Sequence, residues 1–170
     1  GFTVITRDKM YPFVSLTTQS KDDPLVLELL RERLLVNHAA AAQYVPLYAD
    51  AETPEEKLPE LAEALTPELP ISVMLLGMGA DMHTASLFPG ATGVRSAMAD
   101  DAPLLCPIKV AGQDIDRVTL PAHALQGALC KHLVIFGDDK RAAVERAQSQ
   151  PPEDAPIGAV LANATVHWAA

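Results

Sequence analysis

The sequence predicts an α/β fold in which helices flank a mainly parallel sheet. The runs at 71–77, 117–120 and 132–137 suit strands that are buried on both faces of such a parallel sheet. Strand-like and helix-like segments alternate along the chain, which is typical of parallel α/β proteins. The chain has 170 residues, 49% of them hydrophobic, which suits one domain with a substantial core and is short for two. We therefore expect a single α/β domain over residues 1–170.

The first elements are predicted by β-branched residues and by a helix-start signal. Residues 2–6 (FTVIT) are rich in β-branched side chains and predict a strand. The polar, punctuated stretch 7–23 predicts a loop. Asp23 can cap a helix and Pro24 fits its first turn, so we expect a helix over 25–35.

A short strand and a second helix are expected next. Residues 44–49 (YVPLYA) predict the strand. Thr53 and Glu56 have the spacing of a capping box, and Pro54 between them suits the first helical position. The second helix is therefore expected to open here and to run to about Leu65.

The rest of the chain alternates between strands and helices. The run at 71–77 (ISVMLLG) is expected to be an interior strand, because every position in it is apolar, small or a hydroxyl residue. A final strand is expected to close the chain. In order, these elements are strand 71–77, strand 117–120, helix 121–130, strand 132–137, helix 138–148 and strand 164–169.

Charge and cysteine content exclude several classes of protein. The formal net charge of −9 argues against nucleic acid or an anionic membrane as a main partner, but it leaves room for a small anionic substrate. Cys106 and Cys130 are the only cysteines, and we expect both to be buried free thiols of a cytoplasmic protein. No apolar run approaches the roughly 20 residues that span a bilayer. A strand signal begins directly after Gly1, which suggests a fold that is incomplete at the N-terminus.

The segment 75–90 (LLGMGADMHTASLFPG) carries the candidate chemistry. It follows the strongest predicted strand, and ligands of parallel α/β sheets bind beyond the carboxyl ends of the strands. Gly79 lets the backbone turn sharply or approach a ligand. Asp81 can orient the imidazole of His83, the side chain best suited to proton transfer near neutrality, and Thr84 offers a hydroxyl donor. The alternative is that His83 is a hydrogen-bonded bystander in a turn.

This segment resembles the signature of the 6-phosphogluconolactonases, Leu-Gly-x-Gly-x-Asp-Gly-His-Thr-Ala-Ser-Leu-Phe-Pro, and matches all but one of its fixed positions. The sister family of glucosamine-6-phosphate deaminases shares the Gly-His core but continues with Phe-Asn-Glu-Pro, where this chain has SLFP at 86–89. The resemblance extends along most of the chain, through 116–120, 134–147 and 166–168.

The resemblance implies a Rossmann-like fold and the hydrolysis of 6-phospho-D-glucono-1,5-lactone to 6-phosphogluconate in the pentose phosphate pathway. It implies that no metal or organic cofactor is needed, and that a phosphorylated sugar lactone is the partner. His83 would be the general base, with Asp81 beside it. A phosphorylated substrate needs fixed positive charge, for which Lys140 and Arg117 are the candidates; Lys140 lies at a strand-to-helix junction, where anions bind well. Gly79 and Thr84 complete the expected binding residues.

Three departures from the family fall on the expected active site. Met82 stands where the family has glycine, at a position where positive φ or close substrate approach would penalise a side chain. Lys9 stands where the family has a phosphate-gripping arginine, and it keeps the charge but loses the bidentate fork. The family's Gly-Gly-Ser/Arg-Thr-Pro phosphate loop does not occur in these residues. We therefore expect impaired activity.

Two other functions stay open at this point. A non-catalytic lactonase-like scaffold or binding fragment would keep the fold and lose turnover. A sugar-phosphate isomerase or deaminase of the same superfamily is disfavoured by TASLFP at 84–89. An incomplete sheet would expose a strand edge, which would favour self-association or pairing with a complementing fragment.

Overall fold

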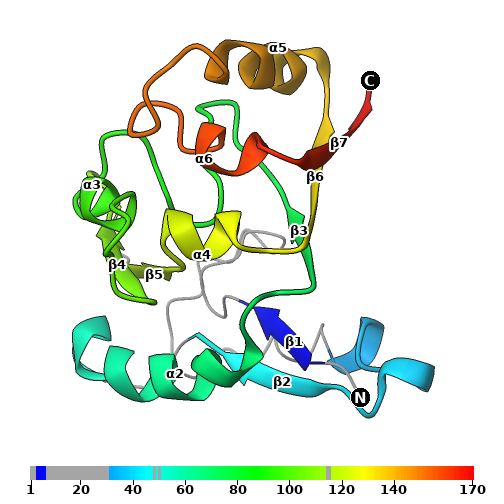
Figure 1. Cartoon of the computed structure of the whole chain (residues 1–170), viewed down its shortest axis with the longest axis vertical. Helices are drawn as coiled ribbons and strands as arrows, with labels where there is room; N and C mark the ends of the chain where they lie inside the picture. The colour runs from blue at the N-terminus through cyan, green and yellow to red at the C-terminus, as the bar shows by residue number, and fades with distance from the viewer. Residues whose placement is uncertain (1–2, 7–30, 48, 50, 114–115) are drawn as a thin grey trace. The chain divides into compact units, whose positions relative to one another are not determined.

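The computed structural model describes residues 3–6, 31–47, 49, 51–113 and 116–170. The chain divides into two compact units, Gly1–Pro67 and Glu68–Ala170, and each is described by itself (Figure 1). The single domain expected over the whole chain stays a prediction.

The first unit contains a parallel strand pair. β1 (Thr3–Thr6) pairs with β2 (Gln43–Pro46), which confirms both predicted strands to within a few residues. The predicted loop at 7–23 and most of the helix expected at 25–35 lie outside the described residues, although residues 31–33 are helical. A short 3₁₀ turn, η1 (Asn37–Ala39), precedes β2.

The second predicted helix is present but begins later than the capping box suggests. Pro54–Glu56 form only a 3₁₀ turn, η2, and the α-helix α2 runs over Leu58–Leu65. The Thr53 hydroxyl donates to the Glu56 carboxylate at 3.3 Å, a bond between side chains. A continuous helix would place Pro59 in its interior, where proline has no N–H to donate and its ring clashes with the preceding turn. The helix therefore restarts with proline in its first turn, and the 3₁₀ turn η3 (Thr66–Glu68) follows it.

The second unit is built on a parallel sheet in the order β3–β6–β7. β3 is Val73–Leu76, β6 is Cys130–Phe136 and β7 is Ala164–Ala169. The helix α5 (Asp138–Ala147) packs against β6, and α6 (Gly158–Leu161) packs against β7. This arrangement confirms the α/β class. Within the described part of the chain, no helix is long and apolar enough to cross a membrane.

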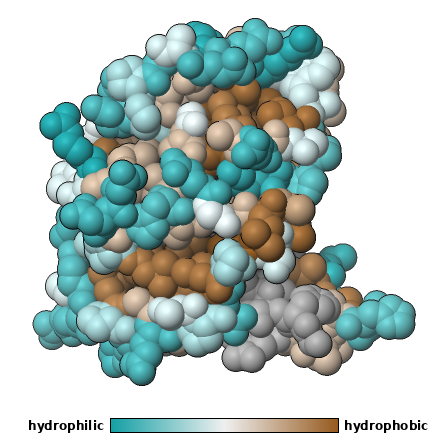
Figure 2. Space-filling model, viewed as in Figure 1, coloured by the Kyte–Doolittle hydropathy of each residue, from teal (hydrophilic) through white to brown (hydrophobic). Residues whose placement is uncertain are grey.

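The prediction that 71–77 is an interior strand buried on both faces is wrong for the part of the chain that the structure describes. β3 lies at the edge of its sheet and pairs with β6. Its side chains alternate: Val73 and Leu75 are 64% and 70% exposed, while Met74 and Leu76 are buried. An apolar run shows that a strand can be buried on both faces, but not that other elements cover both. Figure 2 shows apolar surface, coloured brown, where β3 runs in the same view of Figure 1.

The strand predicted at 117–120 also pairs differently from the prediction. β5 (Asp116–Thr119) runs antiparallel to β4 (Cys106–Lys109), which sequence reasoning did not identify. Pro107 lowers the strand signal of β4, because proline is confined to edge strands and strand ends. Two short helices flank this pair, α3 (Val94–Ala97) and α4 (Ala122–Gln126); α4 is shorter than the predicted 121–130 because β6 already begins at Cys130.

The two cysteines differ in exposure. Cys106 is buried and its thiol donates to the Pro103 carbonyl at 3.3 Å. Burial raises the pKa of the Cys106 thiol to about 11. Cys130 is free and exposed on β6, so the expectation that both thiols are buried is wrong for this residue. It begins the strand on the same open face as Val73, its register partner.

Candidate active site

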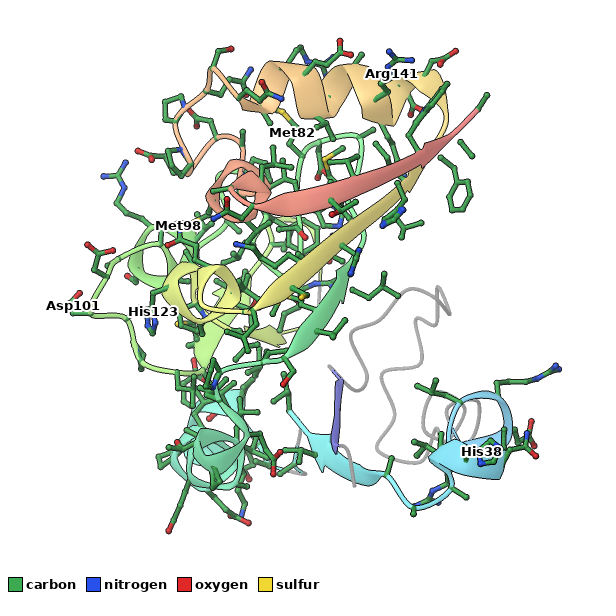
Figure 3. All side chains as sticks on the ribbon, turned by 45° about the vertical axis from the view of Figure 1, so that its right-hand side comes forward. His38, Met82, Met98, Asp101, His123 and Arg141 are labelled. Carbon is green, nitrogen blue, oxygen red and sulfur yellow. The ribbon has the colours of Figure 1, made fainter. Side chains whose placement is uncertain are left out.

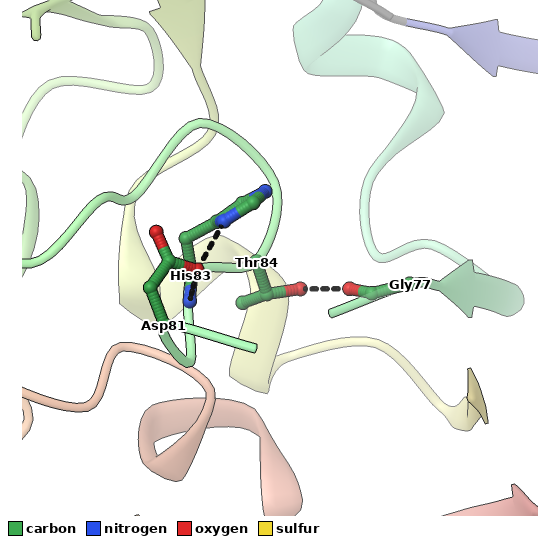
Figure 4. Close-up of polar contacts among 4 residues, drawn as sticks. All are labelled: Gly77, Asp81, His83 and Thr84. Carbon is green, nitrogen blue, oxygen red and sulfur yellow. Dashed lines mark hydrogen bonds and ion pairs between the residues drawn. The ribbon is translucent and has the colours of Figure 1, made fainter. Parts of the chain in front are cut away.

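The loop that follows β3 folds into a tight turn. The backbone N–H of Gly79 donates to the His83 carbonyl at 3.1 Å, and the N–H of Met82 donates to the Gly79 carbonyl at 2.9 Å. The Thr84 hydroxyl donates to the Gly77 carbonyl at 2.9 Å, which ties the end of the turn to the end of the strand (Figure 4). Thr84 is fully buried and its hydroxyl bonds to the backbone. Its contact with substrate stays a prediction.

Asp81 and His83 form a close pair within this turn. His83 Nδ1 lies 2.6 Å from Asp81 Oδ1, and the same oxygen accepts the His83 backbone N–H at 3.2 Å (Figure 4). A carboxylate only accepts hydrogen bonds, so Nδ1 carries a proton, and in the neutral imidazole Nε2 presents a lone pair. The His83 side chain is 26% exposed. This is the tautomer that a general base needs, with a carboxylate placed to stabilise the imidazolium that forms.

Gly79 is needed because it leaves space for that pair. A Cβ atom at position 79 would collide with the Asp81 carboxylate and with the His83 imidazole. By contrast, a Cβ atom at Gly77 would meet nothing within 4 Å. Gly77 and Gly79 therefore differ: only Gly79 makes room for the candidate catalytic side chains.

Met82 occupies the left-handed region of backbone conformation, with φ of 68° (its side chain is labelled in Figure 3). This confirms that the position where the chain departs from glycine needs positive φ. A non-glycine residue there costs about 1–2 kcal/mol. The Met82 carbonyl accepts the backbone N–H of Ile157 at 3.1 Å. That bond joins the turn to the segment before α6.

Phe88 contacts both His83 and Arg117, and sequence reasoning did not single it out. Its ring stacks on the His83 imidazole, with centroids 4.2 Å apart and planes 21° apart. The Arg117 guanidinium carbon lies over the Phe88 ring, 5.0 Å from its centroid. The structure thus brings Arg117 to the candidate base through Phe88. The signal available in the sequence was an aromatic residue shortly after a candidate catalytic histidine.

The Arg117 side chain is oriented and partly desolvated. Nη2 and Nε donate to Gln113 Oε1 at 2.7 and 3.2 Å. Burial lowers the pKa of the guanidinium from its ordinary value, but arginine stays charged in proteins at neutral pH. A fixed cation on the same aromatic ring as the imidazole suits binding of a phosphate or stabilisation of an oxyanion.

Lys140 lies in the first turn of α5, directly after β6. Because β6 runs parallel to β3, this turn and the 77–90 loop both lie at carboxyl ends of adjacent strands. Gly137 begins the turn with φ of 87°, and its carbonyl accepts the Trp168 indole N–H at 3.0 Å. That Lys140 converges with His83 and Arg117 stays a prediction, and Lys9 lies outside the described residues.

The described residues hold no cluster of three or more His, Cys, Asp or Glu side chains that could bind a metal. That no cofactor is needed stays an expectation. The site supplies an oriented imidazole, a carboxylate and a guanidinium. Such a set can activate water and stabilise developing negative charge.

Comparison with known proteins finds a matching family and several relatives. Residues 18–168 match the family described as glucosamine-6-phosphate isomerases/6-phosphogluconolactonase. The chain is 39% identical over 145 residues to a 6-phosphogluconolactonase of Pseudomonas aeruginosa, covering 82% of this chain and 60% of the relative. It is 36% identical over 149 residues to one of Rhizobium meliloti, covering 83% and 64%.

A solved structure shows the same fold. The crystal structure of a 6-phosphogluconolactonase from Shewanella baltica superposes with a TM-score of 0.76 at 31% identity, covering 84% of this chain and 63% of that one. In each of these comparisons the chain spans less than two thirds of the length of the protein it matches.

Proposed function

The chain belongs to the family of glucosamine-6-phosphate isomerases and 6-phosphogluconolactonases, and on that premise we propose that it hydrolyses 6-phospho-D-glucono-1,5-lactone to 6-phosphogluconate. The observation that carries this proposal is the 2.6 Å contact between His83 Nδ1 and Asp81 Oδ1. It leaves Nε2 of the imidazole as a proton acceptor on a part-exposed side chain. The relatives named above support the choice of lactone as substrate.

The proposed reaction is an ester hydrolysis with His83 as general base. Nε2 takes a proton from water while the water oxygen bonds to the lactone carbonyl carbon, and the carbonyl oxygen becomes an oxyanion. When the intermediate collapses, the bond from carbon to the ring oxygen breaks and the imidazolium returns its proton to that oxygen. Asp81 stabilises the imidazolium between these steps. Arg117 is the cation that would stabilise the oxyanion or bind the phosphate.

Phosphate binding is assigned to Lys140, Arg117 and Lys9. Lys140 lies in the first turn of a ten-residue helix, where the helix dipole favours an anion. Two acidic residues share that turn, so a cationic side chain is needed to make it attractive to phosphate.

We propose that the activity of this chain is weak. Replacing a bidentate arginine contact with Lys9 loses part of a charge-assisted bond worth about 1.5–3 kcal/mol. The strained backbone at Met82 puts a side chain where the family has glycine. Because each 1.4 kcal/mol is about tenfold in rate, losing the arginine contact alone would reduce kcat/KM on the order of tenfold.

A non-catalytic, lactonase-like scaffold is the second candidate, and Met82 is the observation that favours it. The free edge of β3 among the described strands supports association with a second copy or with a complementing fragment. Sedimentation at several protein concentrations tests this self-association.

The proposed role in the pentose phosphate pathway would place the chain in the cytoplasm.

The experiment that tests the proposed substrate compares two lactones. Rates above spontaneous opening are measured for 6-phosphogluconolactone and for unphosphorylated gluconolactone, with the unmodified chain and with Lys140→Ala. We expect the phosphorylated lactone to be preferred, and the preference to shrink at least about tenfold in Lys140→Ala, the cost of one charge-assisted contact. Equal rates with both lactones would contradict the proposal.

A further inference from the structure

We infer that Phe88 is a positioning residue that holds the candidate base His83 and the cation Arg117 in one fixed arrangement. This inference rests on the proposed function and adds to it a residue that does not touch the reacting atoms. The geometry is the stack of the Phe88 ring on the His83 imidazole at 4.2 Å and the guanidinium carbon of Arg117 at 5.0 Å from the same ring.

The 77–90 loop, which carries Phe88, contacts β5 at two points. The backbone N–H of Ser86 donates to Thr119 Oγ1 at 3.2 Å, a contact between buried groups. Two residues further along the loop, Phe88 contacts Arg117, which is two residues before Thr119. Side chains two apart on a strand lie on the same face, so both contacts come from one face of β5. The loop and the strand are therefore held in a fixed register.

The backbone on either side of Phe88 is also constrained. The N–H of Leu87 donates to the Thr84 carbonyl at 2.9 Å, and the N–H of Ala91 donates to the Phe88 carbonyl at 3.2 Å. Leu87 is fully buried. The aromatic ring is therefore carried on an anchored segment and can serve as a rigid surface for its neighbours.

Asp81 and Phe88 constrain the imidazole in complementary ways. The Asp81 carboxylate fixes the direction of Nδ1, whereas the stacked ring restricts the plane of the imidazole. Together they define where Nε2 points. The hydrogen bonds to Gln113 hold the edge of the Arg117 guanidinium. The Phe88 ring attracts the face of the same guanidinium. A leucine at position 88 would supply apolar contact but neither a flat surface nor a ring quadrupole.

The test compares Phe88→Leu with Phe88→Tyr, which keeps the ring and serves as the matched control. Lactone hydrolysis gives kcat and KM, and calorimetry gives the affinity for 6-phosphogluconate. We expect Phe88→Leu to lower kcat/KM at least about tenfold, the scale of misplaced catalytic groups, and Phe88→Tyr to stay within about threefold. Equal losses in the two variants, or an unchanged rate in Phe88→Leu, would overturn the inference.

A double-mutant cycle with Arg117→Lys separates positioning from general destabilisation. If Phe88 acts through Arg117, the two substitutions are non-additive, and Arg117→Lys costs at least about threefold less in the Phe88→Leu background. Additive losses would overturn the inference.

The His83→Ala variant, measured beside Phe88→Leu, distinguishes this inference from the proposed function. If His83→Ala abolishes activity while Phe88→Leu is neutral, only the inference about Phe88 fails. A chain that neither hydrolyses the lactone nor binds 6-phosphogluconate overturns both.

Discussion

Nδ1 of His83 lies 2.6 Å from Oδ1 of Asp81, two residues earlier in the same turn. One carboxylate oxygen also accepts the backbone N–H of His83, so Asp81 fixes both the position and the tautomer of the imidazole. The pair is local in sequence and depends on a glycine at position 79 that leaves space for it.

Replacing Asp81 with asparagine keeps the size of the side chain and removes its charge. We expect Asp81→Asn to lower kcat by at least about tenfold, with little change in KM, because the imidazolium loses its counter-charge and the tautomer is no longer fixed. Steady-state kinetics of lactone hydrolysis measures this. A rise in KM at constant kcat would instead assign Asp81 to substrate binding.

Alanine at Gly77 and at Gly79 provides a matched comparison. Gly79→Ala puts a methyl group into the Asp81–His83 pair, whereas Gly77→Ala meets open space. We expect the first variant to lose at least about tenfold in kcat/KM, because the pair must shift, and the second to stay within about twofold. Similar activity in the two variants would show that the pair does not need this space.

The strain at Met82 predicts an order of stability. At φ of 68°, glycine is accommodated freely and alanine is not, so Met82→Gly should be more stable than Met82→Ala by about 1 kcal/mol. Urea unfolding measures the difference. In the right-handed helix α5 the preference reverses, so Ala142→Gly serves as a control and should lose about 1 kcal/mol. Equal stability of the two Met82 variants would contradict the strain.

Cys106 predicts a stability change in alkaline solution. Burial raises the pKa of this thiol from 9.0 to about 11, so the unfolded chain ionises at a lower pH than the folded chain. The stability that the neutral thiol provides is complete below pH 9 and is lost as the pH rises through about 11. We expect the stability advantage of the unmodified chain over Cys106→Ala, measured by urea unfolding, to shrink as the pH rises from 9.0 to about 11. A constant advantage would contradict the raised pKa.

The sequence predicted those features that depend on neighbouring residues. The Asp81–His83 pair and the strand at 164–169 were found because spacing and β-branched residues are local signals. The capping box does not predict the delayed start of α2, because that start is set by Pro59, which fits the first turn of a helix but not its interior. The stack of Arg117 on Phe88 could not be predicted, because it joins residues that are far apart in the chain and depends on how β5 packs.

The open face of β3 shows a second limit. Val73 and Leu75 have the composition of a buried strand, yet both are exposed in the described structure. Local composition records which environment a side chain favours. It does not record whether another element covers that side chain.

The central claim is that His83 is the general base of a lactonase, and the most direct test is a pair of rates. Hydrolysis of 6-phosphogluconolactone is measured with the unmodified chain and with His83→Ala, each against spontaneous opening of the lactone. We predict that the unmodified chain hydrolyses the lactone slowly but faster than the spontaneous reaction, and that the rate of His83→Ala falls to the spontaneous rate. Loss of a general base lowers a rate by about 10² to 10⁴, so the spontaneous reaction sets the floor of the measured loss. A rate above the spontaneous one that His83→Ala leaves unchanged would contradict the claim.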